Sequence, residues 1–213
     1  MIDNRLVLND SSSVEFQEAF NILRTNLSFA LSGKKNKIVA LTCTNKKENP
    51  GTVALNLAIS FSQIESNKVL LVDGDMHSSA LSVMLEQSGK DGFSECLSGN
   101  AVKENSIISL GGIDFLPSGN TPSNPANILG SATARELCQT LKNSYDYVFV
   151  VLPPVNFWSD ASIFAKFADG FLPVVRHKFT KFKEIDTLLK NLRIADGKIL
   201  GFVYNNAPYK RKK

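Results

Sequence analysis

Short, continuous apolar runs that alternate with helical patterns constrain the fold of this chain more than any other feature. Such runs lie at residues 38–43 (IVALTC), 68–73 (KVLLVD), 113–116, 147–152 (YVFVVL), 170–175 and 199–204. Between them, apolar residues recur at helical spacing over 14–31, 52–62, 80–86, 134–142, 161–167 and 183–192. Strands without polar alternation are buried on both faces. The pattern therefore predicts a three-layer α/β fold, with a mostly parallel sheet covered by helices on both faces.

The length and composition fit one hydrophobic core. The chain has 213 residues, of which 43% are hydrophobic and 21% charged, as in ordinary globular proteins. We expect a single domain over residues 1–213, with a leading helix region at 1–33, a loop-rich stretch at 91–125 and a basic tail at 206–213.

The net charge of +4 is modest, and the last four residues, Lys210 to Lys213, supply much of it. The tail either touches an acidic membrane or partner, or is a solvated, frayed end. The rest of the chain is near neutral, and we expect no nucleic-acid partner. Residues 1–13 are polar and mixed in charge, unlike a secretory signal. With Cys43, Cys96 and Cys138 expected as reduced core thiols, this favours a cytoplasmic protein.

Polar residues follow several of the expected strands. In parallel sheets, ligands bind beyond the carboxyl ends of the strands, which directs attention to residues 44–52, 73–77, 153–160 and 205. The strand, loop and helix at 38–62 form the slot of a phosphate-binding P-loop, which reads GxxxxGK[ST] in working examples. Here residues 44–52 read Thr-Asn-Lys-Lys-Glu-Asn-Pro-Gly-Thr. The slot is present, but its sequence is altered.

Many separate pieces, from about Glu15 to Asn205, share their order and spacing with a known family. They are 18–26 (EAFNILRTN), 56–58 (NLA), 70–75 (LLVDGD), 97–99 (LSG), 116–119 (LPSG), 124–125 (NP), 145–148 (YDYV), 153–155 (PPV), 159–161 (SDA), 174–176 (VVR) and 201–205 (GFVYN). The chain resembles the bacterial tyrosine kinases (BY-kinases) of the capsule and exopolysaccharide type, within the MinD/ParA-like P-loop group. The resemblance implies a P-loop NTPase-like fold and a site for ATP or ADP with Mg²⁺.

Against that family, the phosphate-binding loop is degenerate. Counting back from the NLA stretch, the family's lysine falls on Pro50, its Mg²⁺-binding hydroxyl on Gly51, and two loop glycines on Lys47 and Asn49. Thr52 keeps the family's residue type. Proline offers neither a charge nor an N–H group, and the loss of glycine limits how closely the backbone can approach a phosphate.

The second acidic motif is also altered, whereas the third survives. Valine stands where the family has an aspartate before its double proline, in Val150-Val151-Leu152-Pro153-Pro154. Asp73 and Asp75 match the motif that the family uses for Mg²⁺ and for activating the attacking hydroxyl, although its arginine is His77 here. Phosphoryl transfer depends on positioning and charge neutralisation, and one preorganised donor is worth about 3 kcal/mol. We therefore expect severely impaired catalysis.

Several residues of the degenerate site have two interpretations. Lys46 or Lys47 reaches a phosphate from the other side of the loop, or each is an ordinary solvated lysine. Asn205 matches the family position that reads adenine, or it is a turn residue beside Asn206. Asp160 matches an acidic ligand position, or it is the N-cap of the following helix, which we favour.

The resemblance also implies assembly. The family joins subunits through a Glu, Arg, Arg pattern on its leading helix, and this chain offers Glu18, Asn21 and Arg24. That face forms a homo-oligomer, or it is a solvated helix surface. The family's C-terminal tyrosine cluster is absent, and Tyr209 is the one phosphoacceptor candidate in the tail.

We expect a degenerate, kinase-like partner in capsule or exopolysaccharide synthesis that acts by binding. The resemblance implies a membrane-embedded polysaccharide co-polymerase, or chain-length regulator, as its partner, which would recruit it to the inner face of the membrane. One alternative is an active, ATP-dependent tyrosine autokinase with an unconventional loop. Another is a MinD/ParA-like positioning ATPase.

Overall fold

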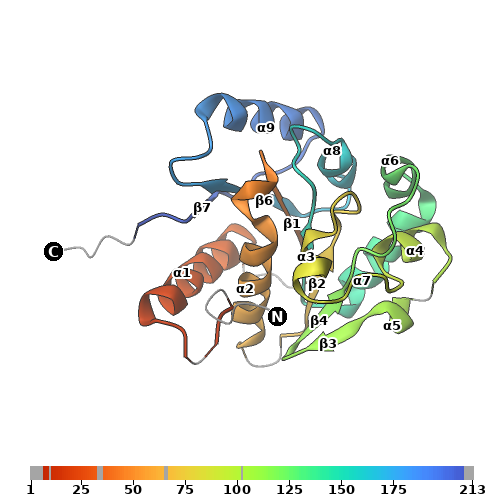
Figure 1. The fold of residues 1–213 in the computed structure, drawn as a ribbon, viewed down its shortest axis with the longest axis horizontal. Coiled ribbons are helices and arrows are strands. Elements are labelled where there is room, and N and C mark those ends of the chain that lie inside the picture. The colour runs from red at the N-terminus through yellow and green to blue at the C-terminus, as the bar shows by residue number, and fades with distance from the viewer. Residues whose placement is uncertain (1–6, 10, 33–35, 65–66, 102, 209–213) are drawn as a thin grey trace.

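A sheet of seven strands, in the order β3-β4-β2-β5-β1-β6-β7, forms the centre of the fold (Figure 1). The computed structural model describes residues 7–9, 11–32, 36–64, 67–101 and 103–208. The strands are β1 (Lys37–Cys43), β2 (Val69–Asp73), β3 (Ile108–Leu110), β4 (Ile113–Leu116), β5 (Tyr147–Val151), β6 (Gly170–Arg176) and β7 (Val203–Asn205). The helices are α1 (Val14–Ala30), η2 (Lys46–Glu48), α2 (Pro50–Ser62), α3 (Ala80–Met84), α4 (Phe93–Ser98), α5 (Lys103–Ser106), α6 (Pro125–Leu129), α7 (Ala132–Ser144), α8 (Asp160–Phe164) and α9 (Phe182–Ile194).

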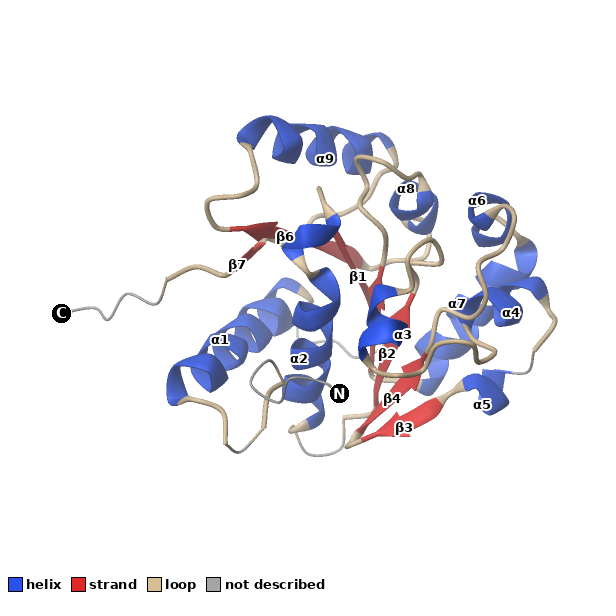
Figure 2. Cartoon of the chain, in the orientation of Figure 1, coloured by secondary structure: helices blue, strands red, loops and turns tan. Residues whose placement is uncertain are grey.

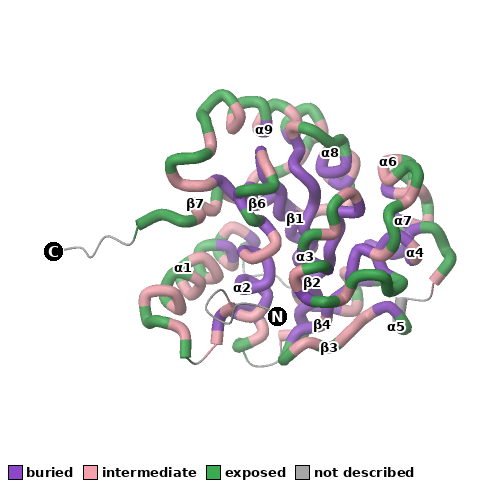
Figure 3. The backbone as a smooth tube through the Cα atoms, viewed as in Figure 1, coloured by how far each residue is buried: buried purple, intermediate pink, exposed green. Residues whose placement is uncertain are grey.

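Every neighbouring pair of strands is parallel except β3 and β4, which form an antiparallel hairpin at one edge. The central strands β1, β2 and β5 are buried almost throughout, as their continuous apolar sequences predict (Figure 3). Helices cover both faces of the sheet (Figure 2). The expected three-layer, mostly parallel α/β fold is confirmed.

The two faces of the sheet carry separate apolar cores because successive side chains of a strand point to opposite sides. Val39 and Leu41 of β1 pack with α1, α2 and α3, and Ile38 and Ala40 pack with α4, α7, α8 and α9. Phe61 of α2 is fully buried on the first face, and Phe164 of α8 is buried on the second. The carboxyl ends of the strands remain at one edge, between these two layers.

The stretch expected to be rich in loops, 91–125, contains more regular structure than its sequence suggests. It holds α4, α5, β3, β4 and the start of α6. These elements are only three to six residues long, so none shows a full hydrophobic period. Strand β3 exists because it pairs with β4 across a turn at Gly111 and Gly112, which both have positive φ.

The last strand is shorter than expected. The apolar run at 199–204 predicts a strand along its whole length, but β7 begins at Val203 and pairs with β6 only from Val174 onward. Phe171 bonds to the β7 side of β6, so Pro173, two residues later, faces the same side. Proline has no N–H group to donate, which leaves a gap in the ladder between the bridge at Ile199 and the start of β7.

Within the described ranges, no helix is both long and apolar enough to cross a membrane. Tyr209 and the basic residues 210–213 lie outside the described residues, so their predicted roles remain predictions.

Candidate functional site

A small pocket lies at the carboxyl ends of β1, β2 and β5, where the fold predicts a ligand site. Its volume is about 120 Å³. It is lined by the end of β1, the first turn of α2, the loop after β2, helix α3 and the end of β5: Cys43, Lys46, Asn49, Pro50, Gly51, Thr52, Asp73, Asp75, Ser78, Ala80, Leu81, Met84, Val151, Leu152 and Pro154. Five predicted site residues, Lys46, Gly51, Thr52, Asp73 and Asp75, thus meet around one space.

The loop between β1 and α2 is a chain of turns and caps. Asn45 caps the single turn η2, with its side chain accepting a hydrogen bond from the Lys47 N–H at 3.1 Å. Asn49 takes the left-handed conformation with φ of 56°, which asparagine tolerates better than most residues. Pro50 then begins α2 at a first-turn position that suits its fixed φ. Helix α2 therefore starts two residues before the expected Thr52.

Glu48 is the residue of this loop that the sequence analysis missed. Its side chain is fully buried and accepts hydrogen bonds from the Thr44 N–H at 2.6 Å, the Thr44 hydroxyl at 2.8 Å and the Asn45 N–H at 3.0 Å. The hydroxyl of Thr180 also donates to it. An internal carboxylate therefore holds donors at the start of the loop. The spacing of Asn45 and Glu48 is that of a capping box, and this signal could have identified it.

The two candidate lysines differ in position. Lys46 lines the pocket, whereas Lys47 is exposed and outside it. The backbone carbonyl of Lys47 accepts a hydrogen bond from Arg176 at 3.0 Å, which ties the loop to the end of β6.

Pro50 and Gly51, the predicted equivalents of the family's lysine and metal-binding hydroxyl, carry neither group. Pro50 is buried, and Gly51 faces Leu81 of α3, so apolar atoms form this wall. The hydroxyl of Thr52 points to the sulfur of Met84 at 3.7 Å. Val151, at the lost aspartate position, is buried in the opposite wall and its carbonyl accepts the Gly74 N–H at 2.8 Å.

Asp73 and Asp75 are both held by their own loop. Asp73 accepts hydrogen bonds from the Ser82 N–H at 2.8 Å, the Ser82 hydroxyl at 2.7 Å and the Asp75 N–H at 3.2 Å. Burial raises the pKa of Asp73 to about 6, against the opposing effect of the Ser82 hydrogen bonds and with a further rise from Asp75. Asp75 accepts from the N–H groups of His77 and Ser78 at 3.2 and 3.1 Å and from the Ser78 hydroxyl.

Across the described part of the chain, no group of three or more His, Cys, Asp and Glu side chains is arranged to hold a metal ion. Within the described residues, the two predicted metal ligands, Asp73 and Asp75, therefore have no third His, Cys, Asp or Glu side chain placed to share a metal ion with them. Their oxygens accept hydrogen bonds from the loop and from Ser82, which fixes the orientation of both carboxylates.

The Asp160 side chain meets His77, which occupies the arginine position of the third motif. Asp160 is 2% exposed and lies 3.0 Å from Nε2 of His77, whose ring stacks on Trp158 at 3.7 Å between centroids. The N-cap interpretation of Asp160 is wrong: Ser159 precedes α8, and Asp160 is its first helical residue. The cause is tertiary, since the buried carboxylate is turned toward His77 of another loop.

Asn205 ends β7 on the far side of the β1–α2 loop. Its Nδ2 donates to the Glu48 carbonyl at 3.0 Å, and its Oδ1 accepts from the Asn206 N–H at 2.9 Å. These contacts fit the turn interpretation and leave the amide engaged within the chain. Asn205 is not among the residues that line the pocket.

The predicted assembly residues lie on α1 and point to different surroundings. Glu18 is exposed. The guanidinium of Arg24 is half-buried and donates to the carbonyl and hydroxyl of Ser60 on α2, at 2.5 and 3.0 Å. In this single chain Arg24 therefore joins α1 to α2.

No family model matches the chain, but it is similar in sequence and in fold to several known proteins. The chain is 33% identical to the tyrosine-protein kinase CpsD of Streptococcus agalactiae serotype III over 192 residues, or 89% of this chain and 82% of that protein. Its fold matches the chimerical protein CapA2B2 with a TM-score of 0.87 at 28% identity, covering 98% of this chain and 92% of that one. The MinD protein of Pyrococcus horikoshii, solved with Mg-ADP, matches with a TM-score of 0.65 at 22% identity, covering 79% and 69% of the two chains, which shows a shared fold.

Proposed function

Because this chain belongs to the bacterial tyrosine-protein kinase family of capsule and exopolysaccharide pathways, we propose that it acts in such a pathway by binding and does not transfer phosphate. The main support for this proposal is the set of residues in the loop between β1 and α2. Glu48 fills its first donors with an internal carboxylate, and Pro50 stands in the place of the family's ammonium group.

The residues around the pocket do not fit Mg-ATP. Charge is the first reason: Pro50 supplies no cation for the phosphates, and Lys46 is the one lysine or arginine among the residues that line the pocket. Size is the second reason, because the pocket volume of about 120 Å³ is below the roughly 300–1,000 Å³ that is usual for small-molecule sites. The wall formed by Pro50, Leu81 and Met84 is also apolar.

Calorimetric titration of Mg-ATP and Mg-ADP into the purified chain tests this proposal. We expect no binding heat and no thermal shift, whereas a ligand at a hundred times its Kd stabilises a protein by about 2.7 kcal/mol. The variant Lys47→Gly/Asn49→Gly/Pro50→Lys/Gly51→Ser/Val151→Asp restores the glycines, lysine, hydroxyl and carboxylate that the resemblance implies, and serves as the positive control. Tight, magnesium-dependent binding by the unmodified chain would contradict the proposal.

An active kinase with an unconventional loop is the second candidate, because Lys46 lines the same pocket as Asp73 and Asp75. In that case Lys46→Ala would abolish ATP binding, while Lys47→Ala, at an exposed position outside the pocket, would not. Phosphate incorporation at Tyr209 or on a partner protein, lost in Asp75→Asn, would establish this activity. A MinD/ParA-like ATPase also needs the missing lysine, and no contact favours it.

We further propose that the protein is cytoplasmic and that a membrane-embedded chain-length regulator recruits it to the membrane. Self-assembly would use the exposed side of α1 that carries Glu18. Light scattering of the wild type and of Glu18→Lys tests this: a mass that falls in the variant supports assembly through α1, and a wild-type monomer at all concentrations contradicts it.

A further inference from the structure

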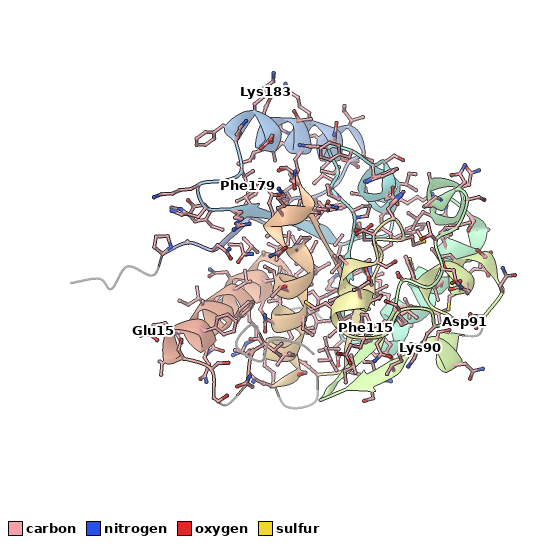
Figure 4. All side chains as sticks on the ribbon, viewed as in Figure 1. Glu15, Lys90, Asp91, Phe115, Phe179 and Lys183 are labelled. Carbon is pink, nitrogen blue, oxygen red and sulfur yellow. The ribbon has the colours of Figure 1, made fainter. Side chains whose placement is uncertain are left out.

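The chain from the end of β6 to the first turn of α9 has an unusual sequence for an exposed segment. Residues 176–183 read Arg-His-Lys-Phe-Thr-Lys-Phe-Lys, with basic and aromatic residues interleaved and no acidic residue. The loop lies at the same edge of the sheet as the pocket, and Lys183 points away from the protein at the start of α9 (Figure 4). We call Lys178, Phe179, Lys181, Phe182 and Lys183, with the neighbouring Phe157 and Trp158, the basic–aromatic surface.

The aromatic side chains of this surface are uncovered. Phe182 is 91% exposed, Phe157 69%, Trp158 46% and Phe179 37%. The two loops that carry them are fastened together, because the side chain of Asn156 donates to the carbonyl of Glu184 at 3.1 Å. Four exposed large aromatic side chains on two joined segments are more than the single exposed apolar residues of an ordinary surface, which favours an interaction site here.

The lysines of this surface have no acidic partner among the ion pairs of the described residues. The nearby acids are used elsewhere: Glu184 accepts the Lys181 N–H at 2.8 Å, and Asp186 pairs with Lys190 at 2.8 Å. Arg176 contacts the Lys47 carbonyl and so adds the exposed Lys46 and Lys47 to the same edge. The cations of residues 176–183, with Lys46 and Lys47, therefore outnumber the neighbouring carboxylates of Glu184 and Asp186, and this edge carries a net positive charge.

The backbone beneath these side chains is already ordered. The hydroxyl of Thr180 accepts from the Arg176 N–H at 2.8 Å and donates to the buried Glu48, and the Glu184 carboxylate accepts the Lys181 N–H at the start of α9. Little ordering entropy is then lost when the surface meets a partner.

We propose that the basic–aromatic surface binds directly to the surface of an anionic lipid bilayer. Phe182 is 91% exposed in the first turn of α9, so its ring is free to enter a partner surface. A protruding ring flanked by Lys181 and Lys183 fits a lipid interface, where the ring enters the acyl boundary and the lysines reach phosphate groups. Such docking turns the pocket edge toward the bilayer. The inference does not depend on whether the pocket binds a nucleotide.

Vesicle binding by the full chain tests the proposal. Vesicles of phosphatidylcholine alone are compared with vesicles that also contain phosphatidylglycerol, by co-sedimentation at low and high salt. Trp158 is the only tryptophan of the chain. Its emission should shift to the blue with anionic vesicles and be quenched by brominated acyl chains. Binding should weaken with salt because the surface charges are screened.

Matched variants locate the contact. Lys181→Gln/Lys183→Gln should weaken partitioning about 25-fold, since each surface lysine contributes about fivefold. The control double variant Arg193→Gln/Lys198→Gln, at the other end of α9, should leave it unchanged. Phe182→Ala should weaken it about tenfold, and Ile194→Ala, at a residue 86% exposed, should not. Circular dichroism confirms that each variant folds.

Three outcomes would overturn the proposal. One is equal partitioning, or none, on neutral and anionic vesicles. Another is sedimentation without Trp158 quenching, or sedimentation that disappears when the four basic residues 210–213 are replaced by glutamine, because the tail would then carry the binding. The third is binding of single-stranded nucleic acid that outcompetes the vesicles. The two proposals fail separately: a lack of vesicle binding leaves the calorimetric result with Mg-ATP unaffected, and binding of Mg-ATP would overturn the proposed function without changing the vesicle results.

Discussion

Two loops frame the pocket, and they have diverged from the family in different ways. The loop after β2 keeps Asp73 and Asp75, and serines of its own segment hold both carboxylates. The loop after β1 has lost the groups that hold a phosphate, but it still leads a strand into a helix through the Asn45 cap, the left-handed Asn49 and Pro50. Side-chain caps and a first-turn proline therefore hold the strand-to-helix path of this loop without the glycines and lysine of a working P-loop.

Removing the Glu48 side chain should cause the largest loss of stability. It would disrupt the hydrogen bonds of the loop after β1 and leave the loop after β2 intact. Glu48→Ala leaves the N–H groups of Thr44 and Asn45 without an acceptor, and we expect a loss of about 4 kcal/mol in the free energy of unfolding. Urea denaturation measures it, with Glu18→Ala as the control at an exposed position. A loss as small as that of the control would show that Glu48 does not hold this loop.

The second prediction concerns pH and the loop after β2. The pKa of Asp73 rises from 3.8 unfolded to about 6 folded, so the folded state holds its proton more tightly. This contribution to stability is complete below about pH 4 and is lost as pH rises through 6, amounting to about 3 kcal/mol. Asp73→Asn should remove that dependence.

Unfolding by urea at several pH values between these limits measures the dependence on Asp73. If the wild type and Asp73→Asn lose the same stability over this range, the titrating group lies elsewhere. An unchanged dependence in Glu48→Ala would confine the effect to the loop after β2.

Gly74 and Gly51, in the loop after β2 and in the first turn of α2, differ in how much room a side chain would have. A Cβ at Gly74, in the loop after β2, would lie 2.8 Å from the Val151 carbonyl oxygen. Backbone atoms there cannot give way cheaply, and Gly74→Ala should cost about 2 kcal/mol in the free energy of unfolding. Thermal or urea unfolding measures it, and a neutral result would mean that the β2–β5 junction is looser than described.

The smallest effect is expected at Gly51, on the other side of the pocket. A Cβ there would lie 3.5 Å from Cβ of Leu81, an ordinary contact. Gly51→Ser should therefore change stability by less than about 0.5 kcal/mol, and it restores the family's hydroxyl without binding Mg-ADP. Calorimetry with the single variant checks this, and nucleotide binding by Gly51→Ser alone would show that the lost lysine matters less than proposed.

The long apolar strands and helices could be predicted from the sequence because their periods are complete. The sequence-based predictions were wrong where contacts between residues far apart in the sequence determine the local structure. Pro173 of β6 shortens β7, and His77 turns Asp160 away from a capping role. The pocket residues could be grouped from strand ends alone. The local hydrogen bonds of Glu48 could have been predicted from the capping-box spacing, whereas its contact with Thr180, far along the chain, could not.

Cys43 gives this arrangement a practical consequence. Its thiol lies in the wall of the pocket, and burial, with the charges of Glu48 and Asp75, raises its pKa far above the ordinary range. A neutral, enclosed sulfur reacts with alkylating reagents only when the surrounding segments separate. The rate at which Cys43 is alkylated, followed by mass spectrometry, would therefore report how often the segments around the pocket open.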